Sequence, residues 1–267
     1  MDVLSVEQEE LGRDEAVSAS EQEAQRPLPP GRVLVSLATY NEVENIPGMV
    51  AAIHEALPDA DVMICDDNSP DGTGKLADSM AAERSWMHVL HRPGKMGLGS
   101  ALVNALKYAE ANGYDYWINM DADFSHPPSA LPALVRGMYE HDVMIGSRYI
   151  PGGGINGWDA KRHFMSKAIN IYSRLMLGLK ARDTSGSYRC YRVSKLAKLD
   201  LKQVYSTGYS FMEEFLFHCK RLGCRIGETP IVFENRRVGQ SKINSTEAIK
   251  ALWALLYVGL RYRLFGR

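Results

Sequence analysis

Residues 116–123 read Tyr-Trp-Ile-Asn-Met-Asp-Ala-Asp, an apolar run that stops at two carboxylates with one residue between them. A short apolar run of this kind predicts a buried strand over Tyr116–Met120. Two carboxylates at the end of a buried strand repel one another and are costly to hold there without a cation. We therefore interpret Asp121 and Asp123 as ligands of Mg²⁺ or Mn²⁺, completed by phosphate oxygens. A strand-end turn in which Asp123 caps the next helix is the alternative.

Similar apolar runs lie on both sides of this one. Strands are predicted at residues 33–37, 61–65, 87–91, 116–120 and 143–145. Helical spacing of apolar residues separates them, and Pro47 stands at the start of the first such helix. This alternation predicts an α/β, Rossmann-like fold, with a mostly parallel central sheet and helices on both faces. The second half is less regular and predicts helices at 160–179, 209–222 and 247–260 and a strand at 226–233.

Polar clusters follow several of the predicted strands. Residues 38–42 read Ala-Thr-Tyr-Asn-Glu, and residues 66–73 read Asp-Asp-Asn-Ser-Pro-Asp-Gly-Thr. Helix caps and tight turns are the plain interpretation of such clusters. However, ligands of parallel sheets bind beyond the carboxyl ends of the strands. Cationic groups that suit phosphates follow later strands, at Arg148 and within residues 236–242. Together these groups predict a metal–diphosphate site at one sheet edge.

Composition excludes several other classes of protein. The chain has 267 residues, of which 45% are hydrophobic and 24% charged, as in soluble proteins of one or two domains. A net charge of −1 argues against nucleic acid as a partner held by bulk charge. The four cysteines form no CxxC pair, which argues against zinc or a disulfide framework. Leu102 breaks the dinucleotide fingerprint that begins at Gly97, and no P-loop is present.

The two ends of the chain carry opposite charges. Residues 1–30 hold eight acidic and two basic residues, and we expect a disordered acidic tail, with a partner-binding arm as the alternative. Residues 31–243 form the expected main folded domain. Residues 244–267 are expected to form an amphipathic basic helix. Its apolar part, Ala251–Leu260, is too short to span a bilayer. Packing on the domain and lying in a membrane interface both stay open.

Eight segments, in this order, resemble the inverting glycosyltransferases of the GT-A fold, and within them the dolichol-phosphate (polyprenol-phosphate) mannose synthases. Two are the clusters at 39–42 and 66–73. The others are Lys-Met-Gly-Leu-Gly-Ser-Ala at 95–101, Asp-Ala-Asp-Phe-Ser-His-Pro-Pro at 121–128, Gly-Ser-Arg-Tyr at 146–149, Gly-Trp-Asp at 157–159, Thr-Ser-Gly-Ser-Tyr-Arg at 184–189 and Gly-Gln-Ser-Lys at 239–242. The resemblance runs from about residue 33 to residue 242, which is most of the chain.

The resemblance implies transfer of mannose from GDP-mannose to a dolichyl or polyprenyl phosphate, with Mg²⁺ or Mn²⁺ as cofactor. It implies catalytic roles for Asp121, Asp123 and Arg148. Implied metal ligands are Asp121, Asp123 and Ser125, the last where some relatives carry Gln. The implied nucleotide-sugar contacts are Ala38 (usually Pro in the family), Tyr40, Glu42, Cys65, Asp67, Asp121, Ala122, Asp123, Arg148, Arg236 and Lys242.

The resemblance also implies a place in the cell. The catalytic domain is expected on the cytoplasmic face of a membrane, attached peripherally, with small membrane-anchoring subunits as further partners. Three alternatives stay open: another nucleotide-hexose donor such as a UDP-sugar, a non-lipid acceptor, and a non-catalytic module that only binds nucleotide sugars.

Overall fold

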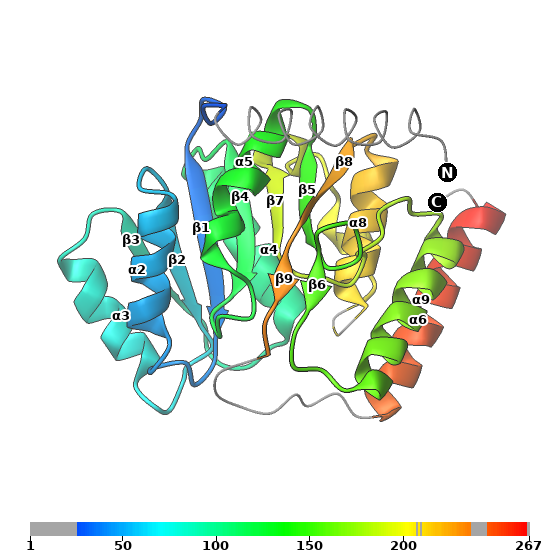
Figure 1. Cartoon of the computed structure of the whole chain (residues 1–267), viewed down its shortest axis with the longest axis horizontal. Helices are drawn as coiled ribbons and strands as arrows, with labels where there is room; N and C mark the ends of the chain where they lie inside the picture. Colours follow the sequence, from blue (N-terminus) through cyan, green and yellow to red (C-terminus); the bar gives the residue numbers. More distant parts are fainter. Residues whose placement is uncertain (1–25, 207, 209, 236–244, 266–267) are drawn as a thin grey trace, which may run out of the picture.

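The computed structural model describes residues 26–206, 208, 210–235 and 245–265, and it contains a seven-stranded sheet covered by helices on both faces (Figure 1). The strand order is β3-β2-β1-β4-β7-β5-β8. The strands are β1 (Val33–Thr39), β2 (Asp61–Asp66), β3 (Met87–His91), β4 (Tyr116–Asp121), β5 (Val143–Ser147), β7 (Arg189–Arg192) and β8 (Ile226–Pro230). All run parallel except β7, which is antiparallel to both its neighbours. The predicted α/β class and the five strands of the first half are confirmed.

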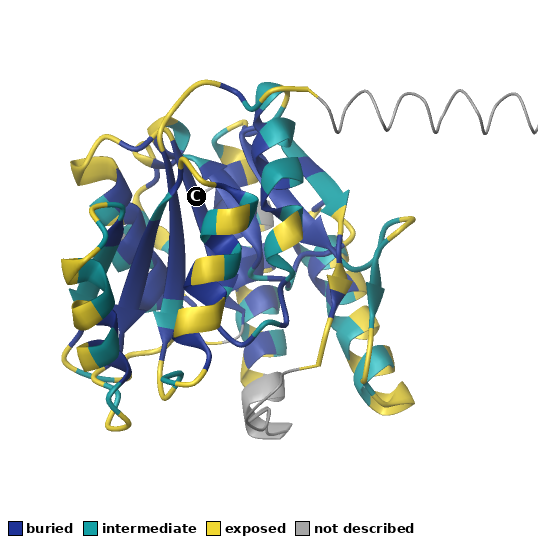
Figure 2. Ribbon diagram, turned by 60° about the vertical axis from the view of Figure 1, so that its left-hand side comes forward, coloured by how far each residue is buried: buried dark blue, intermediate teal, exposed yellow. Residues whose placement is uncertain are grey.

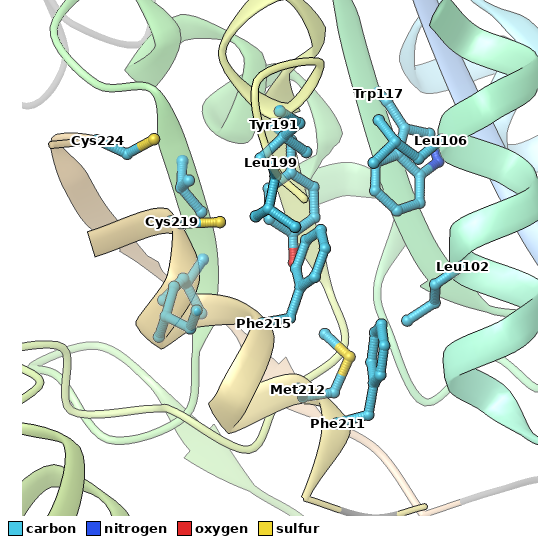
Figure 3. Packing of buried hydrophobic residues seen from close by; sticks show 14 of the residues in the cluster. Leu102, Leu106, Trp117, Tyr191, Leu199, Phe211, Met212, Phe215, Cys219 and Cys224 are labelled. Carbon is cyan, nitrogen blue, oxygen red and sulfur yellow. The ribbon is translucent and has the colours of Figure 1, made fainter. Parts of the chain in front are cut away.

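The sheet separates two hydrophobic clusters, and helices cover the cluster on each face. The helices are α2 (Ile46–Ala56), α3 (Thr73–Ala82), α4 (Leu98–Ala111), α5 (Leu131–Arg136), α6 (Ala160–Leu177), α7 (Val193–Leu196), α8 (Phe211–Arg221) and α9 (Ser245–Phe265). Strand β4 shows why both faces are covered, because its side chains alternate: Trp117 belongs to one cluster, and Ile118 and Met120 to the other. Trp117 stacks on Tyr191 with 5.1 Å between ring centroids, and Phe215 of α8 lies edge-on to Tyr191 (Figure 3).

The strand predicted at 226–233 is two strands in the structure. β8 ends at Pro230, and β9 (Val232–Phe233) leaves the sheet to pair with β6 (Gly154–Ile155). Proline cannot donate to a ladder, so strand pairing ends readily at such a residue. The second, two-stranded sheet therefore lies outside the main one, beside the end of β5.

Helices α6 and α9 lie side by side at one edge of the molecule (Figure 1). They approach closely: Tyr172 Oη donates to the Leu252 carbonyl over 3.2 Å, and a Cβ on Gly259 would lie 2.7 Å from the Met176 carbonyl oxygen. Leu255 of α9 is buried in the core. Within the described residues, no helix has both the length and the apolarity needed to span a membrane.

Figure 2 shows buried residues concentrated in the sheet and exposed residues on the outer faces of the helices. On α6 and α9 some of those exposed residues are large and apolar. They are Phe164, Met165, Ile171, Leu175, Trp253, Tyr257, Leu260 and Leu264. We call this set the α6–α9 apolar face. The C-terminal helix thus packs on the domain and also presents an apolar surface. Residues 1–25 of the predicted tail lie outside the described residues.

Candidate active site

The carboxyl ends of β1, β2 and β4 bring three predicted site residues into one row. Ala38 of β1 pairs in register with Cys65 of β2 on one side and with Asp121 of β4 on the other. The remaining predicted residues Tyr40, Glu42, Asp67, Ala122 and Asp123 follow these strands within four residues. Parallel strands end at the same edge, which is why the sequence could place these groups together. Arg148 follows β5 directly. Arg236 and Lys242 lie outside the described residues.

The turns after β1 and β2 are joined by side-chain hydrogen bonds. The backbone N–H of Asn41 donates to Ser69 Oγ over 3.0 Å, and that of Glu42 to Thr73 Oγ1 over 3.0 Å. Asp71 accepts from Thr73 Oγ1 over 2.6 Å and from the Val43 N–H over 3.2 Å. Burial alone would raise the pKa of Asp71, but these hydrogen bonds outweigh it and lower that pKa. The Ser-Pro-Asp-Gly-Thr motif therefore fixes one turn against the other.

The two neighbouring aspartates of the second turn differ in their contacts. Asp66 is buried and accepts hydrogen bonds from Thr39 Oγ1 at 3.2 Å, Ser69 N at 3.0 Å and Ser69 Oγ at 2.5 Å. Asp67 forms an ion pair instead, with Arg92 Nη1 2.7 Å from its Oδ1. Asp66 thus shapes the turn, whereas Asp67 is paired with a cation that follows β3. Sequence reasoning did not single out Arg92, although it follows β3 and the strand-end rule that located the others applies to it.

The carboxylate pair after β4 is held by hydroxyl groups. Asp121 is about one-third exposed (33%) and accepts from Ser187 Oγ over 3.1 Å. Asp123 is buried and accepts from Ser125 Oγ over 2.6 Å and from Ser125 N over 3.1 Å. The next helices have Pro127 and Ala130 as their N-caps. The alternative in which Asp123 caps a helix is therefore wrong: its carboxylate closes its own turn.

His126 fixes the backbone at the start of this pair. Its Nδ1 accepts a hydrogen bond from the Asp121 N–H over 3.0 Å, so this nitrogen carries no proton. The ring stacks on Tyr188 with 4.9 Å between centroids and meets Phe233 edge-on. Burial lowers the pKa of His126, against the effect of the nearby Asp121 carboxylate. The histidine is thus neutral and positions the backbone of Asp121.

Arg148 has a strong partner in Asp183. Its Nε and Nη2 each lie 2.7 Å from one oxygen of that carboxylate, and its backbone N–H donates to the same group over 3.0 Å. Burial would raise the pKa of Asp183, but the Arg148 guanidinium outweighs it and holds that pKa below its usual value. The predicted phosphate-binding cation is therefore already neutralised by a carboxylate. No sequence signal pointed to Asp183, which follows neither a strand nor a motif.

A cavity of about 360 Å³ adjoins Arg148, between β6 and the first turns of α6. Its lining combines basic and apolar side chains: Arg148, Tyr149, Gly154, Ile155, His163, Phe164 and Lys167. The Tyr149 hydroxyl donates to Ser166 Oγ over 2.7 Å, which ties the loop after β5 to α6. Such a lining suits a ligand with an anionic group attached to an apolar body.

The carboxylate oxygens of Asp121 and Asp123 at the end of β4 are the hard ligands that Mg²⁺ and Mn²⁺ prefer. Across the described part of the chain, no three Asp, Glu, His or Cys side chains gather into a metal cage. Asp121 and Asp123 would thus supply carboxylate ligands, and substrate oxygens would complete the shell. This arrangement is usual for Mg²⁺ held together with a phosphate substrate, so the residues fit the predicted metal.

Comparison with known proteins gives the class first. The pattern of glycosyl transferase family 2 matches residues 35–200. The chain belongs to this family and is a glycosyltransferase. It is 42% identical to undecaprenyl-phosphate mannosyltransferase of Micrococcus luteus over 240 residues, covering 87% of this chain and 99% of that protein. It is 40% identical to polyprenol monophosphomannose synthase of Mycolicibacterium smegmatis over 238 residues, covering 88% and 90%. The resemblance to this branch is confirmed.

Solved structures show the same fold at low sequence identity. Glucosyl-3-phosphoglycerate synthase from Mycobacterium tuberculosis, in complex with Mn²⁺, UDP-glucose and phosphoglyceric acid, matches with a TM-score of 0.63 and 17% identity. The match covers 86% of this chain and 80% of that one. The same protein with Mg²⁺ and UDP matches with a TM-score of 0.58. The predicted GT-A fold is confirmed.

Proposed function

We propose that this glycosyltransferase transfers mannose from GDP-mannose to a polyprenyl or dolichyl phosphate, with inversion at the sugar and with Mg²⁺ or Mn²⁺ as cofactor. The observation that carries the proposal is the row Ala38–Cys65–Asp121, extended by Asp123, at the carboxyl edge of the sheet. Two mannosyl-transferring relatives, 42% and 40% identical over most of the chain, supply the substrate class.

In this proposal the donor nucleotide lies over the ends of β1 and β2. Tyr40 and Glu42 come from the first turn, and Cys65 and Asp67 from the second, which the hydrogen bonds described above hold together. Burial raises the pKa of Cys65 to about 11, so the thiol is neutral and acts as a wall of the pocket. Arg236 and Lys242 of the last predicted cluster would bind phosphates.

Asp121 and Asp123 would hold the metal, with Ala122 beside the donor. Ser125 is the third proposed ligand, and its hydroxyl lies 2.6 Å from Asp123 Oδ1. A divalent ion bound there neutralises charge on the departing diphosphate. The protein contributes placement: Ser187 and His126 fix Asp121, and Ser125 fixes Asp123.

The acceptor is proposed to enter the cavity beside α6. Lys167 and His163 suit its phosphate, while Phe164 and Ile155 suit the prenyl chain. The second pKa of a phosphate monoester is about 6, so the nucleophile is largely anionic near neutral pH. A strong general base is therefore unnecessary, which agrees with a neutral His126 whose Nδ1 is occupied. Attack opposite the leaving diphosphate inverts the linkage.

The lipid acceptor requires contact with a membrane. The α6–α9 apolar face adjoins the proposed acceptor cavity, because Phe164 belongs to both. Lys161 and Arg162 lie on the same helix and suit anionic headgroups. We therefore propose peripheral attachment through this face, on the cytoplasmic side, where small membrane subunits would also dock.

The test is transfer of labelled mannose by the purified protein. With GDP-mannose, polyprenyl phosphate and Mn²⁺ we expect a labelled lipid extracted into organic solvent, and none in excess chelator. Parallel reactions with UDP-hexoses and with water-soluble acceptors separate the remaining alternatives. Transfer from a UDP-sugar alone would overturn the donor assignment. Donor binding without transfer to any acceptor would indicate a non-catalytic module.

A further inference from the structure

Arg92 is a buried cation at the donor edge. It follows β3 directly, its side chain is only 1% exposed, and its backbone N–H donates to the Asp66 carbonyl over 2.8 Å. Removing a guanidinium from water costs several kcal/mol unless its partners compensate. Buried ion pairs of this kind often add little net stability, so the partners of Arg92 indicate what it is for.

Two of its side-chain partners lie on different elements. Nη1 pairs with Asp67 Oδ1 at 2.7 Å, and Nη2 donates to Ser100 Oγ in the first turn of α4. Ser100 Oγ also lies 3.0 Å from the carbonyl oxygens of Met96 and Gly97. Arg92 therefore joins the turn after β2 to the loop that leads into α4.

The charges around Asp67 make Arg92 its main counter-charge. Burial raises the pKa of Asp67, the Arg92 guanidinium lowers it, the neighbouring Asp66 raises it and Lys95 lowers it. Lys95 is also engaged elsewhere, with its Nζ 4.4 Å from the centre of the Tyr40 ring. Cys65 on the same strand end is a neutral thiol, since burial raises its pKa to about 11. Without Arg92, burial and Asp66 would favour protonation of Asp67.

We propose that Arg92 is a positioning residue for the donor nucleotide: it keeps Asp67 as an oriented carboxylate that accepts a hydrogen bond from the nucleoside. This inference rests on the proposed function, which places the nucleotide at Asp67. A carboxylate accepts through both oxygens, whereas a protonated acid loses an acceptor and gains a donor. Loss of Arg92 therefore weakens nucleotide binding most at low pH, where Asp67 takes up a proton.

The test is calorimetric binding of GDP with Mg²⁺ at pH 6 and pH 8. The proteins are wild type, Arg92→Met, Arg92→Lys, Asp67→Asn and the Arg92→Met/Asp67→Asn double variant. Each dissociation constant is divided by the wild-type value at the same pH, so titration of the GDP phosphate cancels. For Arg92→Met we expect this ratio to be about ten at pH 8. The ratio should then rise by up to about tenfold for each pH unit below the pKa that Asp67 has in this variant.

The other variants separate charge from geometry. Arg92→Lys keeps the charge but loses the fork that reaches Ser100, so its ratio should exceed one and stay independent of pH. Asp67→Asn should weaken binding without pH dependence, and adding Arg92→Met to it should change the ratio less than about threefold.

Several outcomes would overturn the inference. One is a pH-independent ratio for Arg92→Met, and another is wild-type affinity in Arg92→Lys. Should Arg92→Met fail to give a cooperative thermal transition, Arg92→Lys and Asp67→Asn still decide, since both keep a polar group in place. If the wild-type protein itself binds no GDP, it is the proposed function that fails.

Discussion

Asp121 and Asp123 differ in exposure although a single residue separates them. Asp121 is 33% exposed and Asp123 is buried, with a serine hydroxyl against each. A buried carboxylate such as that of Asp123 needs positive charge nearby when it is ionised. We expect Asp123→Ala to lower metal-dependent transfer at least about 100-fold, as loss of one group that stabilises developing charge does elsewhere.

The fold should survive that change. Asp123 follows the end of β4, and its hydrogen bonds with Ser125 lie within its own turn. A thermal transition within a few degrees of wild type, measured by circular dichroism, is the expected control. Full transfer activity in Asp123→Ala would remove the metal from the scheme.

Glu213 is a buried acid with no place in the proposed reaction. It is 3% exposed, and its Oε2 has no hydrogen-bond partner. Burial raises its pKa from 4.5 to about 7, against the attraction of Arg189. The folded protein thus binds this proton more tightly than the unfolded chain. The stabilisation is full below pH 4.5 and is lost as the pH rises through 7.

The matching prediction concerns Glu213→Gln, which keeps the shape and removes the charge. At pH 8.5 we expect the free energy of unfolding of the variant to be about 1–3 kcal/mol higher than that of wild type. At pH 4.5 the two free energies of unfolding should be nearly equal. Urea denaturation at the two pH values measures both. A variant less stable than wild type at pH 8.5 would show that the ionised carboxylate is paired.

The first turn of α4 packs closely against the start of α8. A Cβ added to Gly99 would lie 2.5 Å from Phe211 Cδ2 of α8, whereas one added to Gly94 would contact nothing within 4 Å. We expect Gly99→Ala to destabilise the protein by about 1–3 kcal/mol, as overpacking does in other cores. It should also weaken GDP binding, because the loop of residues 95–97 leads into this helix. Gly94→Ala, measured beside it, should behave as wild type.

The sequence predicts the strands of the first half of the chain better than those of the second half. The first half has apolar runs at regular spacing, and all five strands predicted there are present. Strand β7 was missed because Arg-Cys-Tyr-Arg carries no apolar run. Its first residue, Arg189, is fully buried and instead donates to the carbonyls of Met212 and Thr184. Tertiary partners, and not periodicity, hold this strand in the sheet.

The same distinction applies to the candidate site. Periodicity shows where a strand ends, so the sequence located the residues at the edges of β1, β2 and β4. It could not show what faces them. Asp183 neutralises Arg148 from the position just before the segment at 184–189, and Arg92 reaches Asp67 from the end of the next strand. Pairs of opposite charge brought together by the fold have no signature in a single sequence.

At the scale of the whole molecule, the cavity lies between Arg148, which follows β5, and the exposed helix α6. The cavity beside Arg148 is lined by the first turns of α6, and α6 and α9 together carry the apolar face. Large apolar patches on a protein surface commonly mark contact with a membrane or a partner.

We therefore expect the protein to bind vesicles through the α6–α9 apolar face. Phe164 is 72% exposed and Trp253 is 67% exposed, so replacing both with serine removes apolar surface without opening the core. Each side chain buried in lipid contributes on the order of 1–2 kcal/mol, so the double variant should bind at least about tenfold more weakly. Flotation with vesicles containing anionic lipid measures this. The matched control is Met96→Ser, because Met96 is 59% exposed but lies in the loop before α4. Because the change leaves the donor edge intact, GDP affinity should stay at the wild-type value while transfer to vesicle-borne acceptor falls. Equal flotation of the double variant and wild type would show that this face does not contact the membrane.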